Sequence, residues 1–406
     1  MNGAMSTAQP AQPRKPALAG VRILDLSRVL AGPWCTMTLA DLGADVIKIE
    51  NPAGGDDTRG WGPPNVGGES AYFFCANRNK RSVAVDISQP EGQALVRELL
   101  AHCDVVVENF RAGALQRYGL DYESLSASRP DLIYCSISGY GRSSPLADRA
   151  GYDYIMQAEG GLMSITGEAE GEPMKVGVAV ADLFTGMYAV QAILAAIIAR
   201  RNDGLGQRID MALFDCQLTM LANVGSSYLV SGKEPVRYGN GHPAVVPYQV
   251  FPTRDAEIVV AVGNDRQFRL FCEQVLERPD IAADPRFSAN ADRARHREAL
   301  VPLLSDILRT QDAAHWQARL ATTGIPTGRV RTVGAALESP EAQARGMVSE
   351  VEHPTAGSIR LVSSPLRMSG TPVRTPSPPP TLGQHTDEVL AEIGWPTRGR
   401  SQPKVV

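Results

Sequence analysis

Asp182 is the side chain in this sequence best suited to covalent chemistry. It stands in the segment ADLFTGM, directly before a strongly apolar stretch that predicts a long helix over 182–201. Asp is a favoured helix cap, so capping is the commoner role for a residue at such a position. The same place also suits a nucleophile, because helix-terminal amides and the helix dipole favour the ionised carboxylate that attack on an acyl carbonyl requires.

Other familiar catalytic patterns do not occur in the sequence. It contains no G-x-S-x-G elbow, no G-x-x-x-x-G-K-[ST] loop and no G-x-G-x-x-G after a predicted strand. The six histidines are scattered without H-x-x-x-H spacing and no cysteines form a C-x-x-C pair, so the sequence predicts no metal site. His242, in the glycine-rich segment 238–249, is retained as a site candidate, with a plain loop residue as the alternative.

The composition is that of a globular protein. Of 406 residues, 43% are hydrophobic and 21% are charged. A formal net charge of −4 gives no basic excess, so we expect neither nucleic acid nor a membrane surface as a partner. The most apolar stretch, 183–199, falls short of the ~20 apolar residues that a bilayer span needs and predicts a buried core helix. The six cysteines indicate reduced thiols and a cytoplasmic location.

Alternating strand and helix signals predict an α/β fold with a Rossmann-like parallel sheet. Helices are expected at 32–44 and 90–102, and short apolar runs favour strands at 21–26, 45–50, 82–87, 104–109 and 132–138. A strand followed by a helix is expected in 206–223. Ligands of such sheets bind beyond the carboxyl ends of the strands, so we expect the site to include the segments 27–33, 109–113 and 139–143.

Composition shifts along the chain divide it into a large and a small domain. Residues 1–17 predict a flexible lead in which Met1 or Met5 is the true start. The large Rossmann-like domain is expected over 18–224 and a loop-like linker with an active-site loop over 225–248. A small α+β domain is expected over 249–330. A return segment, with a strand at 358–368 and a helix at 387–394, completes the large domain over 331–406.

Taken in order, the segments of the chain resemble the class III CoA-transferases, the CaiB/BaiF family. The resemblance runs from Leu18 to Trp395 and is specific because many weak matches occur in the right order. The matching segments are LAGVRILDLSRVLAGP, LGADVIKIE, GDDTRGWGPP, NRNKRSVAVDI, VVENFRAGALQRYGL, YCSISGYG, RAGYD, ADLFTGM, TGIPTGRV and LGQHTDEVL.

The resemblance implies that Asp182 is the nucleophile. It would attack an acyl-CoA to give an aspartyl anhydride and then an aspartyl-CoA thioester, with CoA as a substrate and no cofactor. The family's CoA contacts carry over to Val29, Leu30, Asn109, Phe110 and Arg117. Its aromatic acyl-site positions carry over to Trp61, Tyr72 and Tyr152, and its flexible covering loop to Gly239, Gly241 and His242. Each of these side chains also has an ordinary structural explanation, as a core, turn or surface residue.

Two family positions differ here. Leu30 replaces a glutamine and Asn51 replaces an arginine, which removes the side-chain contacts that those residues make in the family. The alternative activity is racemisation or epimerisation of a 2-methylacyl-CoA, which needs two bases. The racemase branch has a G-H-D segment, whereas this chain has Gly151-Tyr152-Asp153, so transfer is favoured. A non-catalytic acyl-CoA-binding protein is a third possibility, disfavoured because Asp182 is present.

The segments GGDDTRGWGPP, RAGYD, GHPAVVPYQ and GNDRQF look most like the succinyl-CoA:glutarate branch of the family. We therefore expect succinyl-CoA as donor and a C4–C6 dicarboxylate as acceptor. A distal carboxylate needs a cation or strong donors, for which Arg59, Arg149 and His242 are the candidates. The resemblance also implies an interlocked, ring-shaped homodimer with active sites between subunits.

Overall fold

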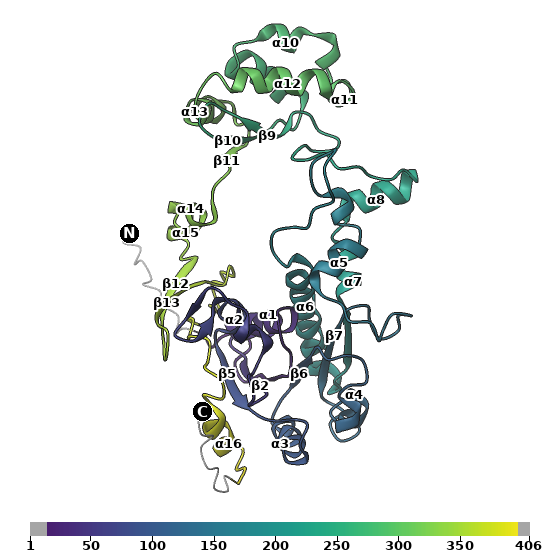
Figure 1. The fold of residues 1–406 in the computed structure, drawn as a ribbon, viewed down its shortest axis with the longest axis vertical. Helices are drawn as coiled ribbons and strands as arrows, with labels where there is room; N and C mark the ends of the chain where they lie inside the picture. The colour runs from purple at the N-terminus through teal and green to yellow at the C-terminus, as the bar shows by residue number, and fades with distance from the viewer. Residues whose placement is uncertain (1–13, 397–406) are drawn as a thin grey trace, which may run out of the picture. The chain divides into compact units, whose positions relative to one another are not determined.

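A computed structural model describes residues 14–396, and these form two compact units (Figure 1). The first unit comprises the described parts of Met1–Gly160, Gly177–Ala222 and Glu341–Val406. The second comprises Gly161–Val176 and Asn223–Pro340. The second unit thus includes residues 161–176, which the sequence prediction placed in the large domain. Residues 1–13 of the predicted lead, with Met1 and Met5, lie outside the described residues.

The first unit is built on a six-stranded parallel sheet. Its order is β5-β2-β1-β6-β7-β8, which in chain order of these six strands is the doubly wound order 3-2-1-4-5-6. The strands are β1 (Arg22–Asp25), β2 (Asp45–Glu50), β5 (Lys80–Ala84), β6 (Val105–Glu108), β7 (Ile133–Ser138) and β8 (Arg208–Ala212). All six were expected, although β5 begins two residues earlier than predicted. The direction of strand addition reverses between β1 and β6, where such folds bind ligands.

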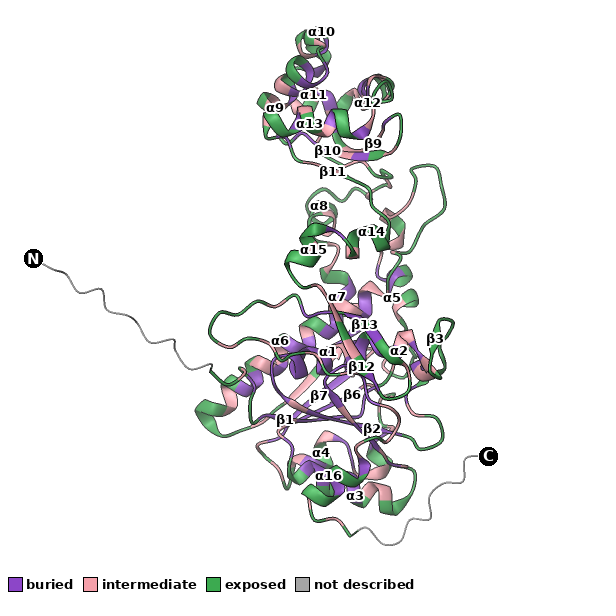
Figure 2. Ribbon diagram, turned by 90° about the vertical axis from the view of Figure 1, so that its left-hand side faces the viewer, coloured by how far each residue is buried: buried purple, intermediate pink, exposed green. Residues whose placement is uncertain are grey.

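Apolar side chains on both faces of the sheet explain why its strands are continuous hydrophobic runs. Successive residues of β1, Ile23 and Leu24, are both fully buried but belong to cores on opposite faces. One face is covered by α1 (Ala31–Asp41) and α6 (Val180–Asp203), and the other by α3 (Pro90–Ala101), α4 (Tyr122–Ser126) and α16 (Thr386–Glu392). Figure 2 shows the buried strands between these helices.

Helix α6 begins earlier than the sequence prediction placed it. It starts at Val180, so Asp182 is the third helical residue and not the cap. The helix also runs two residues beyond the predicted end at residue 201, and Gly204, in the left-handed conformation, ends it. Gly186 lets α6 approach α1 closely, because a Cβ there would lie 2.7 Å from the Ala31 carbonyl oxygen.

Among the described residues, α6 is also the one helix whose length and apolar content would suffice to cross a membrane. That is weak support for a membrane span, because the core helix of a globular protein passes the same test. Ala189, Val190, Ile193 and Ile197 of α6 are buried in the core of the first unit.

Smaller elements complete the first unit. The predicted strand at 358–368 is observed as β13 (Gly357–Val362), but it pairs with β12 (Val348–His353) in an antiparallel hairpin and does not join the main sheet. Ile359 and Leu361 of this hairpin pack on Phe73 and Phe74. The other elements are β3 (Asn65–Val66), β4 (Glu69–Ser70), α2 (Ala71–Asn77), α5 (Asp153–Glu159), α7 (Leu213–Thr219) and the short helices Asp57–Gly60 and Gln116–Tyr118.

The second unit has an antiparallel sheet of order β11-β10-β9, formed by β9 (Tyr248–Pro252), β10 (Glu257–Ala261) and β11 (Thr327–Arg329). Its core packs this sheet against α9 (Asp265–Leu270), the π-helical turn Phe271–Val275, α10 (Pro279–Ala283), α12 (Arg297–Leu308) and α13 (Ala313–Thr323). Also present are α11 (Asn290–Arg295), α14 (Val333–Leu337) and the short helices Met163–Ile165 and Pro285–Phe287, with α15 (Pro340–Ala344) at the boundary between the units.

One predicted loop in this part of the chain is a helix. Residues 224–248 were expected to be loop-like, but α8 covers Ala222–Ser231. Its small and polar residues, such as Gly225, Ser226 and Ser227, obscure the helical pattern in the sequence.

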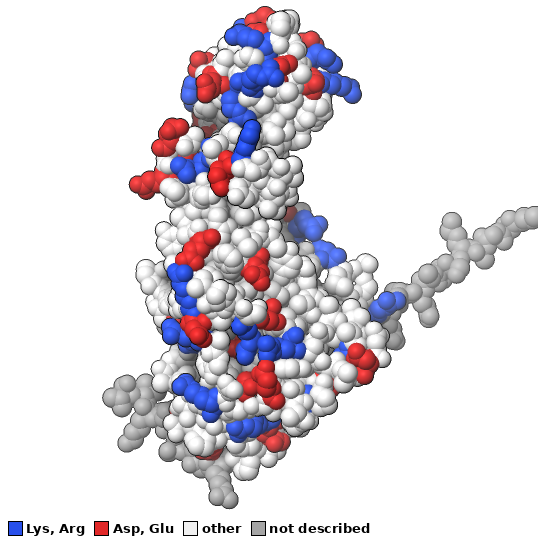
Figure 3. All heavy atoms as spheres, turned by 90° about the vertical axis from the view of Figure 1, so that its right-hand side faces the viewer, with Lys and Arg blue, Asp and Glu red and all other residues white. Residues whose placement is uncertain are grey.

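The surface carries charges of both signs. On the face drawn in Figure 3, basic and acidic side chains are interspersed, in keeping with the small net charge of −4. The unusual charges are those inside the first unit. Lys48 and Asp56 are buried and pair at 2.9 Å, while Lys80 and Asp25 are fully buried and pair at 3.0 Å. Burial raises the pKa of Asp56, but the charge of Lys48 and the hydrogen bonds from Lys48 and Thr58 together lower that pKa to about 2.

Replacing Lys48 by Met is expected to lower the free energy of unfolding by about 3–5 kcal/mol, because it leaves a buried carboxylate unpaired. The loss should diminish as the pH falls toward 2, where Asp56 becomes protonated in the folded protein as well. Denaturant unfolding at pH 7 and pH 3 measures both effects. The exposed pair Arg309–Asp306 is the control, and Arg309→Met there should cost about 1 kcal/mol or less. Equal costs for the two variants would contradict the assignment.

Candidate active site

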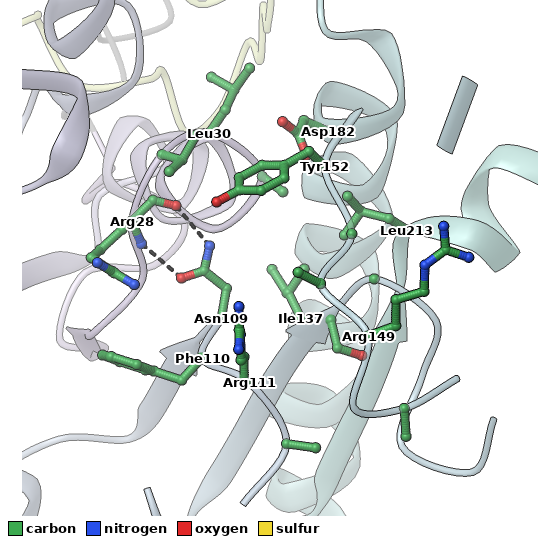
Figure 4. A pocket seen from close by; sticks show the side chains of 18 of the residues that line it. Arg28, Leu30, Asn109, Phe110, Arg111, Ile137, Arg149, Tyr152, Asp182 and Leu213 are labelled. Carbon is green, nitrogen blue, oxygen red and sulfur yellow. Dashed lines mark hydrogen bonds between the residues drawn. The ribbon is translucent and has the colours of Figure 1, made fainter. Parts of the chain in front are cut away.

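A pocket lies at the carboxyl edge of the parallel sheet, at its switch point. It is lined by the turn after β1 (28–31), the turn after β6 (109–112), the end of β7 (137–139), the segment 149–152, and by Asp57, Asp182 and Leu213. Figure 4 shows Asp182 on α6 at one end of the pocket, with Arg28 and Phe110 at the other. All of these residues belong to the first unit. The pocket brings together the predicted site residues Val29, Leu30, Asn109, Phe110, Tyr152 and Asp182.

The turn after β1 is held in an uncommon conformation. Val29 has a φ of 69°, a left-handed value that is strained for a β-branched residue. The Arg28 amide donates to Asn109 Oδ1 at 2.8 Å, and Asn109 Nδ2 donates to the Arg28 carbonyl at 2.7 Å (Figure 4). The Val29 amide donates to Asp56 Oδ1 at 3.1 Å. The Asn109 side chain therefore joins two strand-ending turns and holds Arg28, the residue before Val29.

Asp182 is 9% exposed and lies in the first turn of α6. Burial, followed by the negative charge of Asp153, raises the pKa of this carboxyl group to about 7. The expectation that the helix terminus keeps Asp182 ionised is therefore wrong at neutral pH, where only about half of the groups carry a charge. The physical reason is that desolvation and a like charge outweigh the dipole of α6.

Asp153 is a site residue that the sequence analysis used only to compare motifs. As the first residue of α5, it places its Oδ1 2.7 Å from the amide nitrogen of Ala181, which donates the hydrogen bond. Its position in the segment GYD, at the start of a helix, is the signal that would have marked it as a capping residue. It caps a different helix from its own.

The aromatic candidates Trp61 and Tyr72 contact each other edge to face, with ring centroids 5.2 Å apart. Burial raises the pKa of Tyr72 to about 12, and the nearby charge of Asp182 contributes next. Tyr72 therefore lies within electrostatic reach of the Asp182 carboxylate. Tyr152 is 62% exposed and lines the same pocket as Asp182.

Of the three arginines that the sequence analysis selected, Arg149 lines the pocket and Arg117 and Arg59 do not. Arg117 lies over the ring of Tyr118, 4.6 Å from its centroid, and is not among the pocket residues. Arg59 is committed to ion pairs with Glu50 and Glu69, so its guanidinium is already neutralised. The pocket is lined instead by Arg149, as proposed for the distal carboxylate, and by two arginines that the sequence analysis did not select, Arg28 and Arg111.

A second pocket adjoins the first through shared side chains. Arg28 and Phe110 line both, and the guanidinium carbon of Arg28 lies 5.3 Å from the Phe110 ring centroid. Asn51, which stands where the resembling family has an arginine, lines this second pocket. Arg28 is thus a cation beside the position that Asn51 leaves uncharged, and its ion pair with the half-exposed Asp57 is 3.1 Å long.

The glycine-rich loop belongs to the second unit. The Gly239 amide donates to the Gly167 carbonyl at 3.2 Å, and the Gly241 amide to that of Tyr238 at 2.9 Å. His242 Nδ1 accepts hydrogen bonds from the amides of Ala244 and Val245. Its imidazole therefore organises its own turn. Within residues 14–396, no group of three or more His, Cys, Asp and Glu side chains is arranged to hold a metal ion.

Comparison with known proteins gives consistent matches over nearly the whole chain. The family model for CoA-transferase family III matches residues 18–386. The succinate–glutarate CoA-transferase of Agrobacterium fabrum is 49% identical, over 94% of this chain and 96% of that protein. The human succinyl-CoA:glutarate CoA-transferase is 44% identical, over 93% of this chain and 86% of that protein.

A solved structure of the same family also matches this chain. A CaiB/BaiF family protein from Brucella suis has a TM-score of 0.84 and is 46% identical, over 94% of this chain and all of that one. Its likeness extends through both units described here. The chain therefore belongs to CoA-transferase family III and is an enzyme that transfers coenzyme A.

Proposed function

We propose that this enzyme transfers CoA from succinyl-CoA to a C4–C6 dicarboxylate such as glutarate, with Asp182 as the covalent nucleophile. The relatives named for succinate and glutarate support the substrates. The observation that carries the nucleophile is a buried carboxylate that lines the pocket at the sheet's switch point. Asp182 is the one acidic residue of this pocket that is buried, since Asp57 is half-exposed and paired with Arg28.

The proposed reaction proceeds through two anhydrides and one thioester. A carboxylate oxygen of Asp182 attacks the donor thioester and expels CoA thiolate, which leaves an aspartyl–acyl anhydride. The thiolate attacks the aspartyl carbonyl and releases the donor acid, leaving an aspartyl-CoA thioester. The acceptor carboxylate attacks the carbonyl of that thioester and expels CoA thiolate, which forms the second anhydride. CoA thiolate then attacks the acceptor's acyl carbonyl, which frees acyl-CoA and regenerates Asp182.

The environment of Asp182 suits this role. A carboxylate whose pKa is raised to about 7 is more basic than an ordinary aspartate, and nucleophilicity rises with basicity within one type of group. Desolvation also removes the water shell that would shield the attacking oxygen. The cost is that about half of the sites are protonated at pH 7.

Asp182→Ala should lower kcat by about 10³-fold or more, because the covalent route is lost. With succinyl-CoA and no acceptor, hydroxylamine should convert Asp182 of the native enzyme to a hydroxamate, which peptide mass spectrometry locates. The Asp57→Ala variant, which changes the other acidic residue lining the pocket, should still form the hydroxamate at position 182. A hydroxamate on any other residue would refute the assignment.

Arg149 is the proposed partner of the acceptor's distal carboxylate. It lines the pocket with Asp182, its side chain is half-exposed, and its ion pair with Glu159 is at the surface. Arg59 is excluded from this role because its guanidinium group already forms ion pairs with Glu50 and Glu69. His242 lies in the other unit, and its Nδ1 is occupied by two amides.

Replacing Arg149 tests its proposed contact with the acceptor. Arg149→Gln should raise KM for glutarate by about 10- to 100-fold, the worth of a charge-assisted hydrogen bond, and leave KM for succinyl-CoA nearly unchanged. Arg117→Gln, which lies outside the pocket, is the matched control and should leave KM for glutarate as it is. Efficient turnover of oxalate or a carnitine-like acid, without turnover of glutarate, would overturn the substrate assignment.

The interlocked homodimer remains a proposal. Exposed apolar side chains on α8 support a partner at that helix, since Leu229 is 82% exposed and Val230 is 89% exposed. Light scattering should give the mass of a dimer, and Leu229→Asp combined with Val230→Asp should weaken association. A fully active monomer would contradict the proposal.

In the proposed route a carboxylate and a thiol carry all the chemistry, so CoA acts as a substrate and no metal or organic cofactor takes part. We propose a cytoplasmic location. The six cysteines are free thiols and five of them are buried, which suits a reducing compartment.

A further inference from the structure

The first turn of α6 takes its capping group from another helix. The N-cap residue of α6, Ala179, makes no side-chain capping bond. The first amides of a helix have no partner within it and need an acceptor. Asp153, at the start of α5, supplies one, because its Oδ1 lies 2.7 Å from the Ala181 nitrogen. Ala181 directly precedes Asp182, so this bond fixes the peptide that carries the nucleophile.

The second oxygen of Asp153 is also held. Gln157, fully buried and one turn further along α5, donates its Nε2 hydrogen to Asp153 Oδ2 at 2.8 Å. The two bonds set the direction of the Asp153 carboxylate from both sides. The side chain therefore has one orientation relative to the first turn of α6.

The charge of Asp153 also acts on the pKa of Asp182. The groups around Asp182 are Tyr72 of α2 and, along the pocket, Arg28, Asp57, Arg111 and Arg149. Burial raises the pKa of Asp182 most, and the charge of Asp153 raises it further.

We propose that Asp153 is a positioning residue for the nucleophile: through the Ala181 amide it fixes the first turn of α6, and through its charge it tunes the reactivity of the Asp182 carboxylate. The catalytic part of this inference rests on the proposed function. The anchoring and electrostatic parts concern the folded protein alone, so they can be tested without substrate.

The first experiment uses thermal stability and needs no activity. The folded pKa of Asp182 is raised, so the folded protein binds more protons than the unfolded chain from about pH 4 to about pH 7, and stability falls over that window. Asp182→Asn should therefore raise Tm at pH 8 and change it little near pH 4. In an Asp153→Asn background, the gain in Tm at pH 8 should shrink, because the like charge is gone.

The second experiment separates the charge of Asp153 from its hydrogen bond. Asp153→Asn keeps an oxygen acceptor for the Ala181 amide and removes the charge, whereas Asp153→Ala removes both. Asp153→Asn should move the ascending limb of the kcat/KM pH profile to lower pH by about one unit. Asp153→Ala should in addition lower kcat and speed hydrogen exchange in the peptide containing Ala181. Asp215, an exposed acid in the first turn of α7, provides the matched control. Asp215→Asn should leave the pH profile, kcat and the hydrogen exchange at Ala181 unchanged.

Each outcome decides one part of the proposal. If the gain in Tm from Asp182→Asn at pH 8 is the same in both backgrounds, the charge role is wrong. If Asp153→Ala leaves hydrogen exchange at Ala181 unchanged, the anchoring role is wrong. If the stability results hold but the pH profile of Asp153→Asn matches that of the native enzyme, the contacts stand and Asp182 is not the group that limits the rate, which is a failure of the proposed function.

Discussion

Burial of charge at the carboxyl edge of the parallel sheet is the constraint on which the site depends. Four charged residues are buried next to the turn after β1, which lines the pocket. They are Lys48, Lys80, Asp25 and Asp56. Such groups are tolerated only when each finds a partner. Here the partners include the turn itself, since Lys48 donates to the Ser27 carbonyl at 2.7 Å and Asp56 accepts the Val29 amide. These two hydrogen bonds connect the strained turn to buried charged groups.

Burial next to a charged neighbour also sets the pKa of Asp182, but in the opposite direction. Asp25 and Asp56 are buried next to ammonium groups, which stabilise their charged forms, and their pKa values are lowered despite burial. Asp182 is buried next to another carboxylate, and its pKa rises to about 7. The same edge of the sheet thus has two kinds of buried acid. Asp25 and Asp56 stay ionised in structural ion pairs, whereas the charged form of Asp182 is destabilised. A destabilised carboxylate is a stronger nucleophile, and this links burial to the proposed chemistry.

The positions of the strands along the chain and much of the site could be predicted from sequence. The apolar runs located five strands of the sheet, and the sixth lies in the segment 206–223 where a strand was expected. The segments after the strands supplied Val29, Leu30, Asn109 and Phe110, which line one pocket with Asp182. The resemblance chose the right family because many ordered segments matched at once. It also carried over Arg117, which stacks on Tyr118 away from the pocket, because a motif position does not fix where a long side chain points.

What the sequence could not supply were the interactions between distant residues. The cap of α6 comes from Asp153, 28 positions before the amide that it accepts, so no local pattern reveals it. The start of α6 was misplaced by two residues for the same reason, since Asp182 looks like a cap only until another acid is seen in that role. Likewise Arg59 looks like a free cation in the sequence, and only the fold shows that Glu50 and Glu69 neutralise it.

Isotope transfer tests the central claim most directly. In the proposed route an oxygen of the acceptor carboxylate becomes the bridging oxygen of the second anhydride and stays on Asp182 when acyl-CoA leaves. Turnover of succinyl-CoA with glutarate labelled with ¹⁸O in its carboxylates should therefore place ¹⁸O in the Asp182 side chain, detectable by mass spectrometry of the peptide that contains it. Complete conversion of labelled glutarate with no ¹⁸O in that peptide would contradict covalent catalysis by Asp182.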